Sequence, residues 1–199
     1  MNLPNKLTVL RCIMTPLMLA ALLLEFPYHF GVALLLFVAA SLTDMLDGKI
    51  ARKHNLITNL GKFLDPLADK MLTTAAFLGI MCRIGNMDVM CWALMLILTR
   101  EFMVTSVRLL AAKDGVVVAA SFAGKLKTVM QFVAIVFELA ALEFSTWESG
   151  LLAGLKLPHL VFEIPLIVGY ALLWISVVLT ATSGAQYVWA NRKFFKDAK

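Results

Sequence analysis

Four aspartates, Asp44, Asp47, Asp65 and Asp69, lie within one stretch of 26 residues, close to long apolar runs. An ionised side chain at membrane depth costs roughly 2.5–3.5 kcal/mol on insertion scales, so four carboxylates there need compensation. A polar cavity that holds cations would supply it. We therefore expect these aspartates to form a cation-binding site with a chemical function.

The chemical type of these side chains predicts which cations they bind. Carboxylates without a nearby histidine or cysteine favour hard cations, which indicates Mg²⁺ or Mn²⁺ rather than zinc or copper. Two such ions held side by side stabilise the attacking and leaving oxygens of a displacement at phosphorus. The pattern therefore predicts a pair of ions and a substrate that carries a pyrophosphate.

Helical spacing would bring the aspartates onto two facing surfaces. Positions 44, 47, 48 and 51 recur at i, i+3, i+4 and i+7, and positions 61, 65 and 69 recur at i, i+4 and i+8. Small residues on these faces leave room for a bulky group to approach the backbone. They are Gly48, Ala51 and Gly61. Close packing of helices in the membrane is the alternative explanation for each of them.

The elements that carry these residues are predicted to be membrane-spanning helices. Of the 199 residues, 61% are hydrophobic, against roughly 45–50% in a soluble domain. Apolar runs of about 20 residues, the length that a span needs, predict six helices. They cover residues 7–24, 28–50, 63–82, 89–112, 122–142 and 161–190. We expect an all-α polytopic membrane protein that forms one domain over residues 1–199.

The distribution of charge predicts the orientation of these helices. The termini and the connections on their side carry most of the lysines and arginines, whereas the opposite connections contain only Arg83 and Lys156. By the positive-inside rule, both termini, the aspartates and the polar cavity face the cytoplasm of the cell membrane. The net charge of +5 suits contact with membrane lipids. We expect no nucleic acid partner, because motifs that read bases are absent.

The aspartates also belong to a longer pattern. It reads Asp44-x-x-Asp47-Gly48-x-x-Ala51-Arg52, then eight residues, then Gly61-x-x-x-Asp65-x-x-x-Asp69. This pattern resembles the signature of the CDP-alcohol phosphotransferase family at every fixed position. The resemblance implies six transmembrane helices and an enzyme that displaces CMP from a CDP-linked donor with an alcohol.

The resemblance also implies a role for each position of the pattern. Asp44, Asp47 and Asp65 would bind metal, and Asp69 would bind metal and act as the general base. The remaining positions would line the CDP pocket: Gly48, Ala51, Arg52 and Gly61. An alcohol is a poor nucleophile at neutral pH, so a carboxylate must take its proton as the new bond to phosphorus forms.

Two further segments contain cations that could bind an anionic acceptor. Arg100, Thr105 and Arg108 lie in or next to an apolar run, where an arginine usually pairs or faces a cavity. We expect Glu101 to pair with one of these arginines.

The second cationic segment, Gly124 to Thr128, lies near a predicted helix start, where free N–H groups favour a phosphate. Lys125 and Lys127 are about 200° apart on a helix, so they cannot point into one pocket. Both lysines are candidate ligands of the acceptor phosphate, and we favour Lys125 over Lys127.

These two segments, with the amino-terminal stretch from Leu3 to Thr8 and Arg11, resemble the bacterial branch of the family that makes phosphatidylglycerophosphate. The resemblance implies transfer of a phosphatidyl group from CDP-diacylglycerol to sn-glycerol 3-phosphate, with release of CMP, by a homodimer. A sister enzyme that uses inositol phosphate, serine or phosphatidylglycerol is the nearest alternative. A divalent-cation transporter is a more distant one, because buried carboxylates also mark ion pathways.

Overall fold

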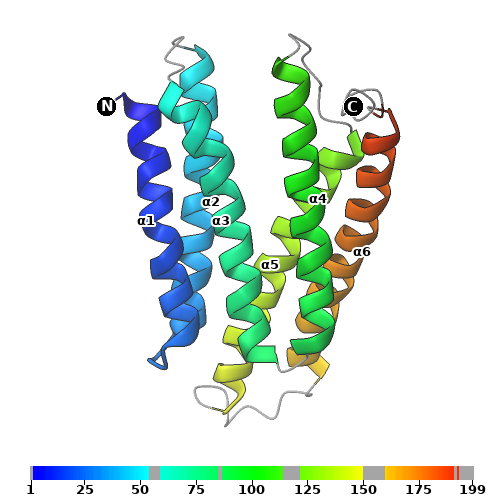
Figure 1. Ribbon diagram of the computed structural model, residues 1–199. Coiled ribbons are helices and arrows are strands. Elements are labelled where there is room, and N and C mark those ends of the chain that lie inside the picture. The colour runs from blue at the N-terminus through cyan, green and yellow to red at the C-terminus, as the bar shows by residue number, and fades with distance from the viewer. Residues whose placement is uncertain are drawn as a thin grey trace. The chain divides into compact units, whose positions relative to one another are not determined.

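Six α-helices make up nearly all of the chain that the computed structural model describes, which is residues 2–53, 59–84, 87–113, 122–149, 160–190 and Arg192 (Figure 1). In chain order the helices are α1 (Leu3–Leu23), α2 (His29–Lys53), α3 (Asn59–Ile84), α4 (Met87–Lys113), α5 (Phe122–Ser149) and α6 (Leu160–Ala190). The prediction of an all-α fold is confirmed.

Each predicted segment corresponds to one of these helices, and the differences lie at the ends. α1 begins at Leu3 rather than at residue 7. Pro4 lies in its first turn, where the missing N–H would have no helical partner anyway. α5 continues to Ser149 rather than ending at residue 142. The reason is that Glu143, whose charge suggested a helix end, is buried and bonded.

Five of the described helices, α1, α2, α4, α5 and α6, are long and apolar enough to cross a membrane. The chain is therefore a polytopic membrane protein by the length and composition of its helices. α3 is as long as its neighbours but falls short in apolar character, because Asp65, Asp69, Lys70 and Arg83 are spread along it. That α3 crosses the membrane stays a prediction.

The helices fall into two compact units, which are described separately. Unit 1 comprises Met1–Gly85 and Ile135–Gly169, and unit 2 comprises Asn86–Ala134 and Tyr170–Lys199. In unit 1, α1 packs along both α2 and α3, whereas contacts between α2 and α3 are sparse among the described residues (Figure 1). Gly79 of α3 allows close packing, because a side chain there would collide with Leu22 of α1.

Two charged side chains form hydrogen bonds with backbone groups where α1 ends and α2 begins. They are the half-buried Arg83 and the buried Glu143. The guanidinium of Arg83 donates hydrogen bonds from Nε to the Leu22 carbonyl and from NH2 to the Leu23 carbonyl, both at 2.8 Å. These bonds satisfy carbonyls that have no partner within α1. Glu143 of α5 accepts a 2.8 Å hydrogen bond from the backbone N–H of Gly31, in the first turn of α2. A carboxylate there also suits the dipole of α2.

Unit 2 has a small apolar core and a close approach between α4 and α6. Val104, Val107 and Tyr187 are buried together. A Cβ atom at Gly184 of α6 would lie 2.7 Å from Cγ of Arg100, so the glycine leaves space for the stem of that arginine. Unit 2 thus holds a long cation deep within its packing.

Candidate functional site

Two of the four aspartates lie against one face of α1. The guanidinium of Arg11 contacts Oδ1 of Asp44 at 2.6 Å, and the hydroxyl of Thr8 donates a 2.7 Å hydrogen bond to Oδ1 of Asp65. Thr8 and Arg11 are three residues apart, so their side chains are neighbours on α1. The structure therefore brings a carboxylate of α2 and a carboxylate of α3 to adjacent places.

The other residues of the pattern lie on α2 and α3, and some of their side chains are described. Asp69 lies one turn from Asp65 on the same face of α3 and is half-buried. Gly61 is buried near the start of α3. The backbone of α2 continues to Lys53, as the predicted spacing requires. The remaining predicted site side chains, on α2, lie outside the described residues: Asp47, Gly48, Ala51 and Arg52.

The described aspartates suit a hard cation in their chemistry. The contacts with Thr8 and Arg11 each use one carboxylate oxygen, and both Asp44 and Asp65 remain accessible, the former with 42% of its side chain exposed. Among the described residues, however, no three carboxylate, histidine or cysteine groups are placed to hold one ion together. Because Asp47 lies outside that set, the predicted two-ion site and its polar cavity stay predictions.

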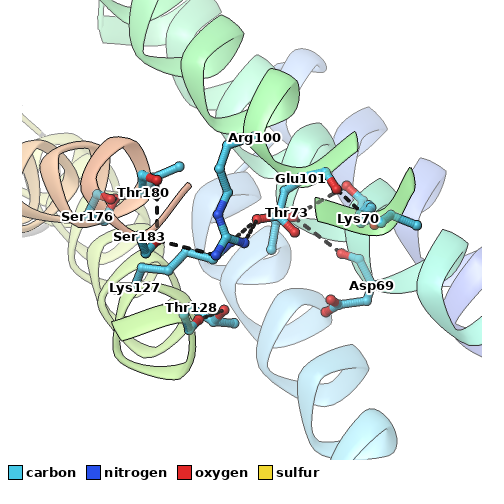
Figure 2. A network of polar contacts seen from close by, with 12 residues as sticks. Asp69, Lys70, Thr73, Arg100, Glu101, Lys127, Thr128, Ser176, Thr180 and Ser183 are labelled. Carbon is cyan, nitrogen blue, oxygen red and sulfur yellow. Dashed lines mark hydrogen bonds and ion pairs between the residues drawn. The ribbon is translucent and has the colours of Figure 1, made fainter. Parts of the chain in front are cut away.

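A buried polar cluster lies in unit 2 and contains three of the residues expected to bind the acceptor or to pair there (Figure 2). Arg100 of α4 is 8% exposed and donates from NH1 to Glu101 at 3.1 Å and from NH2 to the hydroxyl of Ser183, on α6, at 3.3 Å. Lys127 of α5 is 3% exposed and forms an ion pair with the same carboxylate of Glu101. Two cations therefore contact the same carboxylate.

The expected pairing of Glu101 with an arginine is confirmed by its contact with Arg100. Lys125 is exposed whereas Lys127 is buried, which confirms that the two lysines point in different directions. The buried cluster contains Lys127, the lysine that the sequence argument ranked second. Which of them contacts an acceptor stays a prediction.

The last two predicted acceptor residues lie outside this hydrogen-bonded cluster. Thr105 is half-buried, and its hydroxyl donates to the backbone carbonyl of Glu101 at 2.8 Å. Arg108 is exposed, with its guanidinium 5.9 Å from the centre of the Tyr187 ring.

Sequence reasoning assigned no contact role to the residues that hold the predicted groups from other helices, although Thr8 and Arg11 belong to the amino-terminal stretch that resembles the bacterial branch. Thr8 and Arg11 contact the aspartates, and Ser183 and Gly184 surround Arg100. Arg11 also carried a physical signal, since an arginine inside an apolar run usually pairs or faces a cavity. A lone threonine, serine or glycine in a membrane helix gives no comparable indication.

A cavity of about 580 Å³ in unit 1 lies away from the aspartates, with His29, Arg83 and Trp147 among its lining residues. His29 begins α2, and Asp44 follows 15 residues later, which is about 22 Å along a helix. The polar groups of Arg83 in this cavity already bond the end of α1. The cavity is thus separate from the aspartates of the pattern.

Comparisons with known proteins bear on what these residues do. The family model described as CDP-alcohol phosphatidyltransferase matches residues 1–182. A CDP-diacylglycerol–glycerol-3-phosphate 3-phosphatidyltransferase of Bacillus subtilis is 36% identical, covering 99% of this chain and 98% of that protein. The protein of that name in Rickettsia bellii is also 36% identical, covering 98% and 97%. A probable phosphatidylglycerophosphate synthase of Mycobacterium tuberculosis is 44% identical over 67% of this chain and 64% of its own length.

Proposed function

The chain belongs to the CDP-alcohol phosphatidyltransferase family, and we propose that it transfers a phosphatidyl group from CDP-diacylglycerol to sn-glycerol 3-phosphate. The products are phosphatidylglycerophosphate and CMP. The observation that carries this proposal is the identity of 36% with relatives of that stated activity, which spans nearly the whole of both chains. The complete aspartate pattern from Asp44 to Asp69 supports the same reaction class.

In this reaction a hydroxyl oxygen of the acceptor attacks the phosphorus that bears the diacylglycerol group. The new P–O bond forms as the P–O bond to CMP breaks, and CMP leaves with the bonding electrons. Asp69 takes the hydroxyl proton, because a nearby carboxylate is the group that this chain offers as a base. We propose a single in-line displacement without a covalent enzyme intermediate.

The carboxylates at this site would hold divalent metal. Asp44, Asp47, Asp65 and Asp69 supply the oxygen ligands that Mg²⁺ or Mn²⁺ prefers, and we propose that two ions bind there. When bound, such ions neutralise a diphosphate and stabilise a departing phosphate oxygen. The CDP group would lie against the small and basic residues of the same pattern, namely Gly48, Ala51, Arg52 and Gly61.

The phosphate of the acceptor needs cations, and unit 2 supplies them. Arg100 and Lys127 are two cations that contact one carboxylate, and cations of this kind suit the phosphate of an incoming dianion. We propose that these two residues bind the phosphate together with Thr105, while the exposed Arg108 and Lys125 attract it from the cytoplasm. The same charge pattern supports cytoplasmic termini. A homodimer is part of the proposal by family resemblance.

The proposal is tested by CMP release from purified protein in detergent with CDP-diacylglycerol and Mg²⁺. Glycerol 3-phosphate, inositol phosphate, inositol, serine and phosphatidylglycerol are supplied in separate reactions, and EDTA is the control for metal. We expect release with glycerol 3-phosphate alone and none after EDTA. Release with another acceptor would assign the chain to a sister enzyme, and release that is unaffected by EDTA would reject the metal.

A further inference from the structure

Helix α1 carries two buried polar side chains whose partners are the aspartates. Thr8 is 1% exposed and Arg11 is fully buried, although α1 is apolar enough to span a membrane. A buried guanidinium is strongly unfavourable unless a carboxylate compensates its charge. The ion pair with Asp44 supplies that compensation, so the position of Asp44 and the packing of Arg11 depend on each other.

In the described hydrogen bonds the hydroxyl of Thr8 lies near two acceptors, but it has one proton to donate. Its oxygen lies 2.7 Å from Oδ1 of Asp65 and 3.2 Å from the carbonyl of Pro4. The shorter contact, to an ionised acceptor, is the stronger one. Thr8 thus orients the carboxylate of Asp65 rather than merely satisfying the backbone of its own helix.

The packing of unit 1 shows why these two contacts matter for the positions of the aspartates. α1 packs along both α2 and α3, while contacts between α2 and α3 are sparse among the described residues. α1 therefore contacts both of the helices that carry the carboxylates. Groups that bond a metal ligand from behind fix its orientation, and their loss commonly lowers metal affinity about 10- to 100-fold.

We propose that α1 is the positioning element of the carboxylate site, with Thr8 orienting Asp65 and Arg11 orienting Asp44. This inference rests on the proposed function, because it takes the aspartates as metal ligands. Thr8 and Arg11 act through the carboxylates and are positioning residues. Their loss should therefore weaken metal binding more than it weakens the affinity for glycerol 3-phosphate.

The chain provides a matched control for Thr8. Thr15 is also buried on α1, and its hydroxyl also bonds the carbonyl four residues earlier, that of Arg11, at 2.9 Å. Only Thr8 adds a bond to a carboxylate among the hydrogen bonds described for the two. Thr8→Val and Thr15→Val thus remove the same hydroxyl from similar surroundings, and Thr8→Ser restores it.

The experiment titrates each purified variant with Mn²⁺, following the free ion by electron paramagnetic resonance, and measures the Mg²⁺ dependence of CMP release. We expect Thr8→Val to bind Mn²⁺ about tenfold more weakly. Thr15→Val and Thr8→Ser should stay within about twofold of the wild type. The KM for glycerol 3-phosphate should change less than about threefold in all three variants.

A second pair of variants tests Arg11. Arg11→Lys keeps a cation for Asp44, whereas Arg11→Gln removes it, so we expect the lysine variant to retain more Mn²⁺ affinity. Equal Mn²⁺ affinity in Thr8→Val and Thr15→Val would overturn the inference, as would a wild type that binds no Mn²⁺. Because the titration needs no substrate, it gives its answer even if CMP release fails and the proposed function is rejected.

Discussion

Among the residues of the site, Asp69 is the one to which we assign proton transfer in addition to metal binding. Asp69 is a half-buried carboxylate one turn from Asp65, and no other described group of the pattern is assigned to proton transfer. The proposed role of base needs an ionisable oxygen at position 69, whereas the proposed binding of metal is shared with Asp44, Asp47 and Asp65. The role can therefore be separated from substrate binding by a neutral substitution of similar size.

Asp69→Asn should lower kcat by at least about 100-fold, because general base catalysis contributes typically 10²–10⁴-fold. The affinity for CDP-diacylglycerol should change much less, since the amide retains the shape of the side chain. Single-turnover CMP release and equilibrium binding of the donor measure the two quantities. Wild-type turnover in this variant would remove Asp69 as the base.

Lys127 and Lys125 form a natural comparison, because one is buried beside Glu101 and the other is exposed. Lys127→Met should raise the KM for glycerol 3-phosphate about tenfold or more, since it removes a desolvated cation from the proposed phosphate site. Lys125→Met should raise it less than about threefold. Steady-state kinetics at saturating CDP-diacylglycerol measures both KM values. A larger increase for Lys125→Met than for Lys127→Met would favour Lys125 as the phosphate ligand.

At the scale of helices, several elements are joined through single side chains. Glu143 of α5 accepts hydrogen bonds from the backbone of Gly31 and from Nε1 of Trp147, at 2.8 and 2.7 Å. Both partners donate, so a carboxylate with two acceptor oxygens satisfies both. Glu143 thereby ties the second half of α5 to the first turn of α2, which carries Asp44 toward its other end.

Glu143→Gln should destabilise the protein, because the amide offers one acceptor oxygen for two donors. Loss of one of these part-buried hydrogen bonds costs about 0.5–1.5 kcal/mol, which would lower the Tm by a few degrees. Glu25→Gln serves as the control, since Glu25 is 84% exposed and its pair with Arg83 is a surface contact. Thermal unfolding in detergent compares them, and equal Tm values would contradict the role of Glu143.

At the scale of the whole molecule, the charge pattern and the apolar helices together predict an orientation in the membrane. The exposed Lys6 lies at the start of α1, and the exposed Glu25 follows the end of the same helix. Because α1 is long enough to span a membrane, these two residues should face opposite compartments.

Cysteine labelling measures this orientation. In a background without native cysteines, Glu25→Cys should react with a membrane-impermeant maleimide on intact cells. Lys6→Cys should react only after the membrane is permeabilised, as the positive-inside rule predicts. Labelling of Lys6→Cys on intact cells would place the termini and the aspartates outside.

The sequence by itself determined the helices and the reaction class. A chain in lipid satisfies its backbone polar groups within each helix, so apolar length and charge position locate the elements. The fixed spacing from Asp44 to Asp69 is a local pattern, which identified the family before any fold was known. Helix ends were less well predicted where a charge is buried, as at Glu143.

Only the tertiary structure decided which side chains meet across helices. Thr8 reaches Asp65 across 57 positions, Arg100 reaches Ser183 across 83, and Gly31 reaches Glu143 across 112. A threonine or serine in a membrane helix bonds its own backbone equally well, so its sequence neighbourhood does not reveal a distant partner. Packing selects that partner, which is why the support of the carboxylates by α1 emerged from the fold.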